Sequence, residues 1–189
     1  MFLNSKELKR MMKEAFKASN LVVGNTGDAY YLQGTNWKVL CKKSFITKTI
    51  LAEIIELAGE IPEEGECFCA GKDGNQMQVN PMKIDTDTEM TKVEVTNFVL
   101  LENGAARILQ SATGKILLIN NKYINMTTGK HYDQENGETE PEGPYIFGGC
   151  QAYWKNNVME FVTLLRSTEK HEHILEQMEM VDLTEMNEN

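Results

Sequence analysis

Cysteine and histidine are the residues of this chain whose chemistry could bind a metal ion. Cys67 and Cys69 fall on a predicted strand, where alternate residues share a face. His171 and His173 would share a face only if their segment were extended as well. Four such ligands could hold zinc tetrahedrally, but these spacings fit none of the common zinc motifs. We therefore expect buried thiols and exposed imidazoles, with no metal site and no cofactor.

Nucleophilic catalysis needs a serine or cysteine beside a histidine. Cys150 follows Gly148 and Gly149, and His131 or His173 could serve as its base. The two glycines could let a substrate approach the backbone, but they are more typical of a bulge at the corner of a sheet. The glycine-rich fingerprints of phosphate-binding loops do not open any predicted helix. We predict that the protein is not an enzyme and has no catalytic residue.

Basic residues near the start of the chain are the clearest candidates for a binding surface. Four of them recur along one face of the first predicted helix, with Lys9 beside them. Three more lie at the entry of the second predicted helix, where the helix dipole is also positive. Such side chains displace the counterions around nucleic-acid phosphates and so give affinity without sequence specificity. The candidate nucleic-acid-binding residues are Lys6, Arg10, Lys13, Lys17, Lys42, Lys43 and Lys48.

The charge of the chain is strongly asymmetric. Its 189 residues include 19 Lys or Arg and 28 Asp or Glu, a net charge of −9. Residues 1–48 carry nine basic and three acidic side chains, so this part has a net charge of +6 and the remainder −15. A basic end on an acidic body attracts a polyanion at one place and repels it elsewhere. One alternative is that the basic and acidic parts attract one another, within the chain or between copies. Another is a protein-interaction or self-assembly module, in which the basic helix docks on an acidic protein surface.

Composition indicates an ordinary globular protein, with 41% hydrophobic and 25% charged residues. No apolar run could cross a bilayer, and the N-terminus lacks a secretion signal. A basic amphipathic helix can lie on an anionic membrane, but here its apolar stripe would then be lost from the core. Four cysteines without framework spacing indicate free thiols. We expect a cytoplasmic protein that binds no membrane, and homo-oligomer formation is left open.

Two helices are predicted in the first third of the chain. Residues 4–19 have apolar side chains every three to four positions, which form a stripe that faces a core. The asparagine at position 4 is a good N-cap, and Glu7 could return a bond to its amide. The second helix is predicted over residues 45–58, with Ser44 as its N-cap and Gly59 ending it.

The rest of the chain is predicted as short strands joined by tight turns, without crossover helices. This pattern predicts an α+β fold in which two N-terminal helices pack on antiparallel sheet and the C-terminal half is rich in strands. The polar stretch 80–91 is the expected boundary between a helix-containing half, 1–85, and an antiparallel half, 92–183; the alternative is that the two halves form one continuous domain. The expected strands are 21–23, 29–33, 37–42, 66–70, 76–79, 92–101, 106–110, 116–119, 123–126, 145–147, 151–154 and 158–165.

Three segments of the second half carry more specific expectations. Strand 92–101 alternates, which would place Val93, Val95, Val99 and Leu101 on one face. Residues 133–144 carry five acids and no base, so we expect a solvated, mobile loop. From residue 168 onward the apolar pattern suits either a helix or a strand, and we expect a short helix that runs into a final strand or tail.

Residues 4–80 contain a characteristic order of motifs. After the basic helix, residues 27–36 (GDAYYLQGTN) lead through a Gly-Thr-Asn turn into a strand at 37–40. A second helix and the turn 61–66 (IPEEGE) follow, then a hairpin. This order resembles one domain of the bacterial DNA polymerase sliding clamp. The resemblance implies a non-catalytic ring or ring fragment whose helices face DNA with Lys and Arg and whose sheets form the outside. It does not extend to residues 92–189, where no second pair of helices is apparent.

Overall fold

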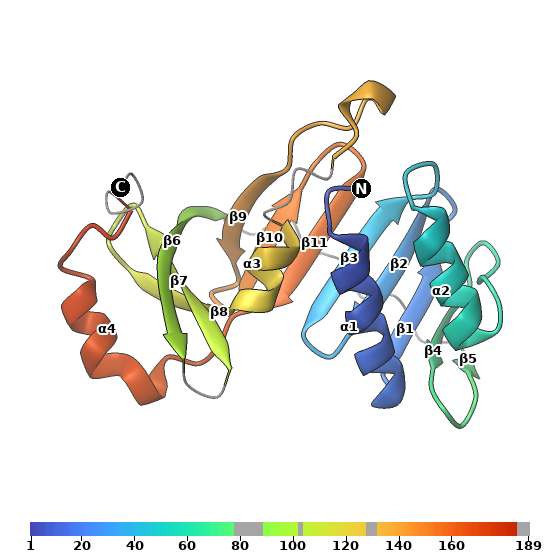
Figure 1. Cartoon of the computed structure of the whole chain (residues 1–189), viewed down its shortest axis with the longest axis horizontal. Helices are drawn as coiled ribbons and strands as arrows, with labels where there is room; N and C mark the ends of the chain where they lie inside the picture. The colour runs from blue at the N-terminus through green and yellow to red at the C-terminus, as the bar shows by residue number, and fades with distance from the viewer. Residues whose placement is uncertain (78–88, 102–103, 128–131, 185–189) are drawn as a thin grey trace. The chain divides into compact units, whose positions relative to one another are not determined.

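The computed structural model describes residues 1–77, 89–101, 104–127 and 132–184 (Figure 1). These residues form four α-helices and eleven strands, and every strand pair with an assigned register is antiparallel. The predicted α+β class with antiparallel sheet is therefore confirmed. The expected boundary at residues 80–91 falls largely outside the described residues.

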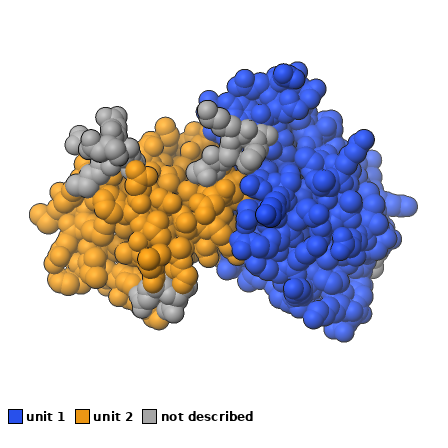
Figure 2. Space-filling view, in the orientation of Figure 1, with its two compact units in different colours: residues 1–84, 129–141, 155–162 blue, residues 85–128, 142–154, 163–189 orange. Residues whose placement is uncertain are grey.

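The chain divides into two compact units (Figure 2). Unit 1 comprises residues 1–84, 129–141 and 155–162, and unit 2 comprises residues 85–128, 142–154 and 163–189. The expected division placed the whole of 92–183 in one half. Two segments from that range belong instead to unit 1, because they pack on the N-terminal residues.

Unit 1 consists of a sheet with two helices on one face (Figure 1). The strand order is β5-β4-β1-β2-β3, with the first part of β11 beside β3. Helices α1 and α2 lie side by side, and α1 contacts β1 and β2. A 3-10 helix, η1 (Gln134–Asn136), also belongs to this unit. The other elements are α1 (Ser5–Lys17), β1 (Leu21–Asn25), β2 (Ala29–Gly34), β3 (Trp37–Lys42), α2 (Lys48–Ala58), β4 (Cys67–Ala70), β5 (Gln76–Met77) and β11 (Met159–Leu164).

Helix α1 forms where its sequence predicts. The Asn4 side chain accepts hydrogen bonds from the amides of Lys6 and Glu7, at 3.0 and 3.3 Å, which satisfies two of the free N–H groups at the helix start. The Glu7 carboxylate does not complete the expected capping box, because it lies 2.7 Å from Arg10. The apolar stripe is buried as predicted, with Leu8, Met11, Met12 and Ala15 in the core and Phe16 half-buried.

Helix α2 begins three residues later than predicted. Its N-cap is Thr47, whose Oγ1 accepts from the Ile50 amide at 3.4 Å, and not Ser44. Phe45 and Ile46 form a turn instead, because their amides both donate to the Lys42 carbonyl. Threonine is also a good N-cap residue, and the turn at residues 45 and 46 moves the start of the helix to Thr47. The predicted stop is confirmed, since the C-cap Gly59 has a left-handed φ of 81°.

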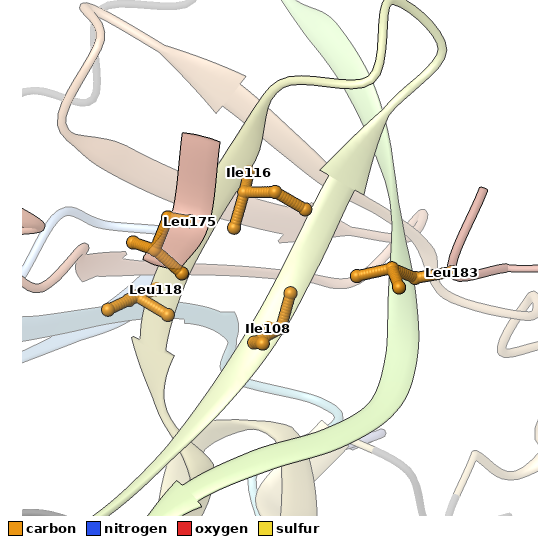
Figure 3. Close-up of a cluster of buried hydrophobic side chains, with 5 residues drawn as sticks. All are labelled: Ile108, Ile116, Leu118, Leu175 and Leu183. Carbon is orange, nitrogen blue, oxygen red and sulfur yellow. The ribbon is translucent and has the colours of Figure 1, made fainter. Parts of the chain in front are cut away.

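Unit 2 contains a sheet of order β10-β9-β6-β7-β8 and the two short helices. One hydrophobic cluster joins β7, β8, α4 and the C-terminal segment; Figure 3 shows its members, Ile108, Ile116, Leu118, Leu175 and Leu183. The elements are β6 (Thr91–Leu101), β7 (Ala105–Ser111), β8 (Ile116–Asn120), α3 (Asn121–Thr127), β9 (Glu142–Phe147), β10 (Gln151–Lys155), the 3-10 helix η2 (Glu169–His171) and α4 (Glu172–Met178).

Two predictions for the strands of unit 2 are wrong. The expected strand 123–126 is helical, because the Asn120 side chain accepts from the Lys122 amide and begins α3. The expected alternation of β6 does not continue along its length, because its register with β7 shifts between Val95 and Val99. Thr96 is buried as a result, and Leu101 is 87% exposed.

The acidic segment 133–144 is not simply a solvated loop. Glu138 is only 2% exposed, and its carboxylate accepts from the Asp133 amide at 2.9 Å and from Asn156 Nδ2 at 3.1 Å. It also pairs with the amino group of Met1. A buried carboxylate needs such partners, so Glu138 ties this segment to the rest of unit 1.

Candidate nucleic-acid interface

The basic residues of α1 lie on the side of the helix opposite its buried stripe. A groove of about 600 Å³ follows this side. Five of its eight lining residues are Lys or Arg and only one, Glu14, is acidic, so the groove is cationic. The lining residues are Ser5, Lys6, Lys9, Arg10, Lys13, Glu14, Lys17 and Thr49.

A buried carboxylate from α2 lies behind this groove. Glu53 is 0% exposed, and its two oxygens lie 3.0 Å from Lys9 Nζ and 3.3 Å from Lys13 Nζ. No hydrogen bond to either oxygen is found among the residues that the structure describes. A buried carboxylate is costly unless it is paired. Glu53 therefore binds these two lysines and holds α1 against α2.

Two candidate residues thus have an acidic neighbour. Lys13 contacts the buried Glu53 and lies 3.9 Å from Glu56, which is exposed on α2. Arg10 pairs with Glu7 one turn away, where both groups are at least partly exposed. Exposed ion pairs contribute little free energy, so Arg10 can exchange its partner easily. Lys13 is the more firmly held of the two, because its carboxylate is buried.

Lys6 and Lys17 differ from them. Both side chains are exposed at opposite ends of α1, and neither forms an ion pair within the described part of the chain. A phosphate group entering the groove could therefore bind them without first displacing a carboxylate. These two residues are the most available cations of the groove.

The three candidates near α2 are arranged differently. Lys48 is exposed in the first turn of α2, next to Thr49 of the groove lining. Lys42 is exposed at the end of β3, whereas Lys43 is half-buried with its Nζ 5.5 Å from the centre of the Tyr30 ring. That distance permits a cation–π interaction. Lys42, Lys43 and Lys48 are not among the residues that line the groove.

Sequence reasoning missed Glu53. Glu53 lies three residues after Ile50 and directly before Ile54, and both isoleucines are fully buried. A single carboxylate within an apolar helix face is the signal that could have identified it, because an acid is rarely buried without a cationic partner.

The thiols show no metal-binding or catalytic arrangement in the described residues. Cys67 is buried, and the Cys69 thiol donates to the Ser19 carbonyl at 3.5 Å. Burial raises the pKa of both thiols. Cys150 is exposed in the turn between β9 and β10. One of its two proposed partners, His131, lies outside the described residues, and the other, His173, is exposed on α4 with its ring 3.3 Å from the Gln177 amide. Among residues with described positions, no three or more His, Cys, Asp or Glu side chains are grouped to hold a metal ion.

Comparison with known proteins does not assign the chain to a family. No protein-family model matches it. No curated protein matches it either. In the described residues, no helix combines the length and apolarity needed to cross a membrane. The functional assignment therefore depends on the geometry and charge of the groove along α1.

Proposed function

We propose that this protein is a non-enzymatic binding protein that uses its α1 and α2 face to contact the phosphates of a nucleic acid. The observation that carries the proposal is the cationic groove along α1, with Lys6 and Lys17 exposed and without ion pairs among the described residues. The groove belongs to the only strongly basic part of an otherwise acidic chain. Such a charge distribution orients a polyanion toward the groove.

The length of the groove suits several consecutive phosphates. Lys6 and Lys17 are eleven residues apart on a continuous helix. At a rise of 1.5 Å per residue they are separated by about 16 Å along the axis, whereas successive phosphates of one duplex strand rise by about 3.4 Å. Lysines bind phosphate as point charges and read no base edges, so binding should be independent of sequence.

We propose further that unit 1 is a domain of the sliding-clamp type and that the protein is cytoplasmic. The order α1-β1-β2-β3-α2-β4-β5 and the position of both helices on one face of the unit 1 sheet support this interpretation. A ring around DNA would require several such units, so the proposal includes a homo-oligomer. Light scattering on the purified chain tests this part, and a strictly monomeric protein with and without DNA would contradict it.

Fluorescence anisotropy with a labelled DNA duplex tests the binding proposal. Replacing two phosphate-contacting lysines lowers the slope of log K against log salt by about 0.9 for each contact. We therefore expect Lys6→Gln with Lys17→Gln to weaken binding about tenfold at low salt and to flatten the slope by nearly two. The matched control is Lys72→Gln with Lys155→Gln, two exposed lysines of unit 1 outside the groove.

The control pair should bind like the wild type. Absence of DNA and RNA binding by the wild type at low salt would contradict the proposal. Equal losses in the two double variants would show that net charge, and not the groove, determines binding.

An acidic protein surface is the second candidate ligand. The specific observation in its favour is that Lys9, Arg10 and Lys13 already have carboxylates as partners in this molecule. An acidic partner, including a second copy of the chain, would place further carboxylates in the groove. A salt-sensitive oligomer without nucleic-acid affinity would favour this candidate over the first.

A further inference from the structure

Glu53 occupies a position where a carboxylate is not required for packing. Its neighbours Ile50 and Ile54 are fully buried, and Glu53 itself is 0% exposed. Replacing a buried ion pair by well-packed apolar side chains is often neutral or stabilising. Helix packing alone therefore does not explain an acid at this position.

The two lysines bound to Glu53 also face the groove. Their side chains remain 36% exposed for Lys9 and 45% for Lys13, and both residues line the groove. Each ammonium group thus has the Glu53 carboxylate on one side and the groove on the other. The three charges together amount to +1, whereas the two lysines alone would contribute +2.

From this geometry we propose that Glu53 is an internal counterion that limits the affinity of the groove for polyanions. The inference depends on the function proposed above. The Glu53 carboxylate pairs with Lys9 and Lys13 from the buried side, so it offsets part of the positive charge that they present to the groove. It holds both lysines in place and offsets half of their charge. A polyanion therefore gains less from this part of the groove than from the exposed Lys6 and Lys17.

A counterion role and a purely structural role of Glu53 predict opposite changes in polyanion affinity when its charge is removed. If Glu53 only positions the lysines or joins the helices, removing its charge should weaken polyanion binding. If it is an internal counterion, the neutral isostere Glu53→Gln should free about one positive charge. We then expect binding to tighten about three- to tenfold at low salt, and the slope of log K against log salt to steepen by about 0.9.

The experiment compares wild type, Glu53→Gln and Glu60→Gln by fluorescence anisotropy on one labelled DNA duplex over a range of salt concentrations. Glu60 is exposed just beyond the end of α2, and its substitution changes the net charge by the same amount. Tighter binding with a steeper slope for Glu53→Gln, beyond any change in Glu60→Gln, supports the proposal. Binding by Glu53→Gln that is weaker than that of the wild type, or the same as that of Glu60→Gln, overturns it.

Folding of each variant is verified by circular dichroism and thermal unfolding before binding is measured. If Glu53→Gln does not fold, Glu53→Met gives the same test, because it removes the charge and fills a similar volume with apolar atoms. Absence of DNA binding by all variants, including the wild type, would contradict the proposed function itself. Binding by the wild type with no gain in the Glu53 variant contradicts only the counterion role.

Discussion

Helices α1 and α4 show how differently the two units of this chain specify a helix. Helix α1 has 13 residues, an N-cap with two side-chain bonds and four buried apolar residues. Helix α4 has seven residues, no side-chain bond at its N-cap and one buried residue, Leu175, while Ile174 is 55% exposed. Helix α1 is therefore supported by local signals and packing together, whereas α4 depends on the buried Leu175 and the half-buried Met178 in the unit 2 cluster.

The charges of the two helices differ as well. Helix α1 carries five Lys or Arg and two Glu, whereas α4 carries two Glu and no Lys or Arg. A polyanion should consequently be attracted to the helix face of unit 1 and not to α4.

The largest difference between the two units is expected in the reactivity of their thiols. Burial raises the pKa of Cys41 in unit 1 from 9.0 to about 12, whereas Cys150 in unit 2 is exposed. Because the thiolate is the reactive form, a rise of three units lowers its fraction about a thousandfold at neutral pH. Iodoacetamide at pH 8 should label Cys150 first and Cys41 only on unfolding, as mass spectrometry of digested protein can measure. Rapid labelling of Cys41 in the folded protein would contradict the buried position of β3.

Truncating one buried leucine in each helix should give the next largest effect, a loss in the free energy of unfolding. Leu8→Ala opens a cavity at a fully buried position, so it should lower the free energy of unfolding by about 2–5 kcal/mol. Leu175→Ala should cost less, because α4 is short and its surroundings can relax more easily. Urea denaturation monitored by circular dichroism measures both. A larger loss for Leu175→Ala than for Leu8→Ala would reverse the comparison.

The N-cap of α1 should contribute a smaller amount to the free energy of unfolding. Asn4→Ala removes two hydrogen bonds to backbone amides, with an expected loss of about 1 kcal/mol. Asn4→Ser retains a side-chain acceptor and should recover most of this loss. The same urea denaturation series measures both variants, and an Asn4→Ala protein as stable as the wild type would show that tertiary packing alone determines where α1 begins.

Local sequence predicts the elements whose signals agree with each other. For α1, the cap residue and the apolar spacing indicate the same helix, and the structure contains it. For α2, Ser44 and Thr47 both satisfy the cap pattern, and only the turn at residue 45 decides between them. Helix α3 could not be predicted in this way, because Tyr123, Ile124 and Met126 are buried in a pattern that also suits a strand.

Contacts between residues distant in sequence explain the features of the structure that local sequence does not predict. Glu138 is buried because Asn156, eighteen residues away, donates to it, and no local pattern in the acidic segment indicates this. The basic row of α1 could be predicted from its spacing. Its partial neutralisation by Glu53 could not, because that ion pair requires two helices separated by three strands in the sequence.

Lysine footprinting tests the central claim most directly. The protein is treated with an acetylating reagent with and without an excess of DNA duplex, and the rate at each lysine is measured by mass spectrometry. We predict that DNA slows acetylation of Lys6 and Lys17 and leaves the exposed Lys72 and Lys155 of the same unit unchanged. Equal rates at all four lysines with and without DNA, or protection of Lys72 and Lys155 instead, would contradict the claim that the groove along α1 binds nucleic acid.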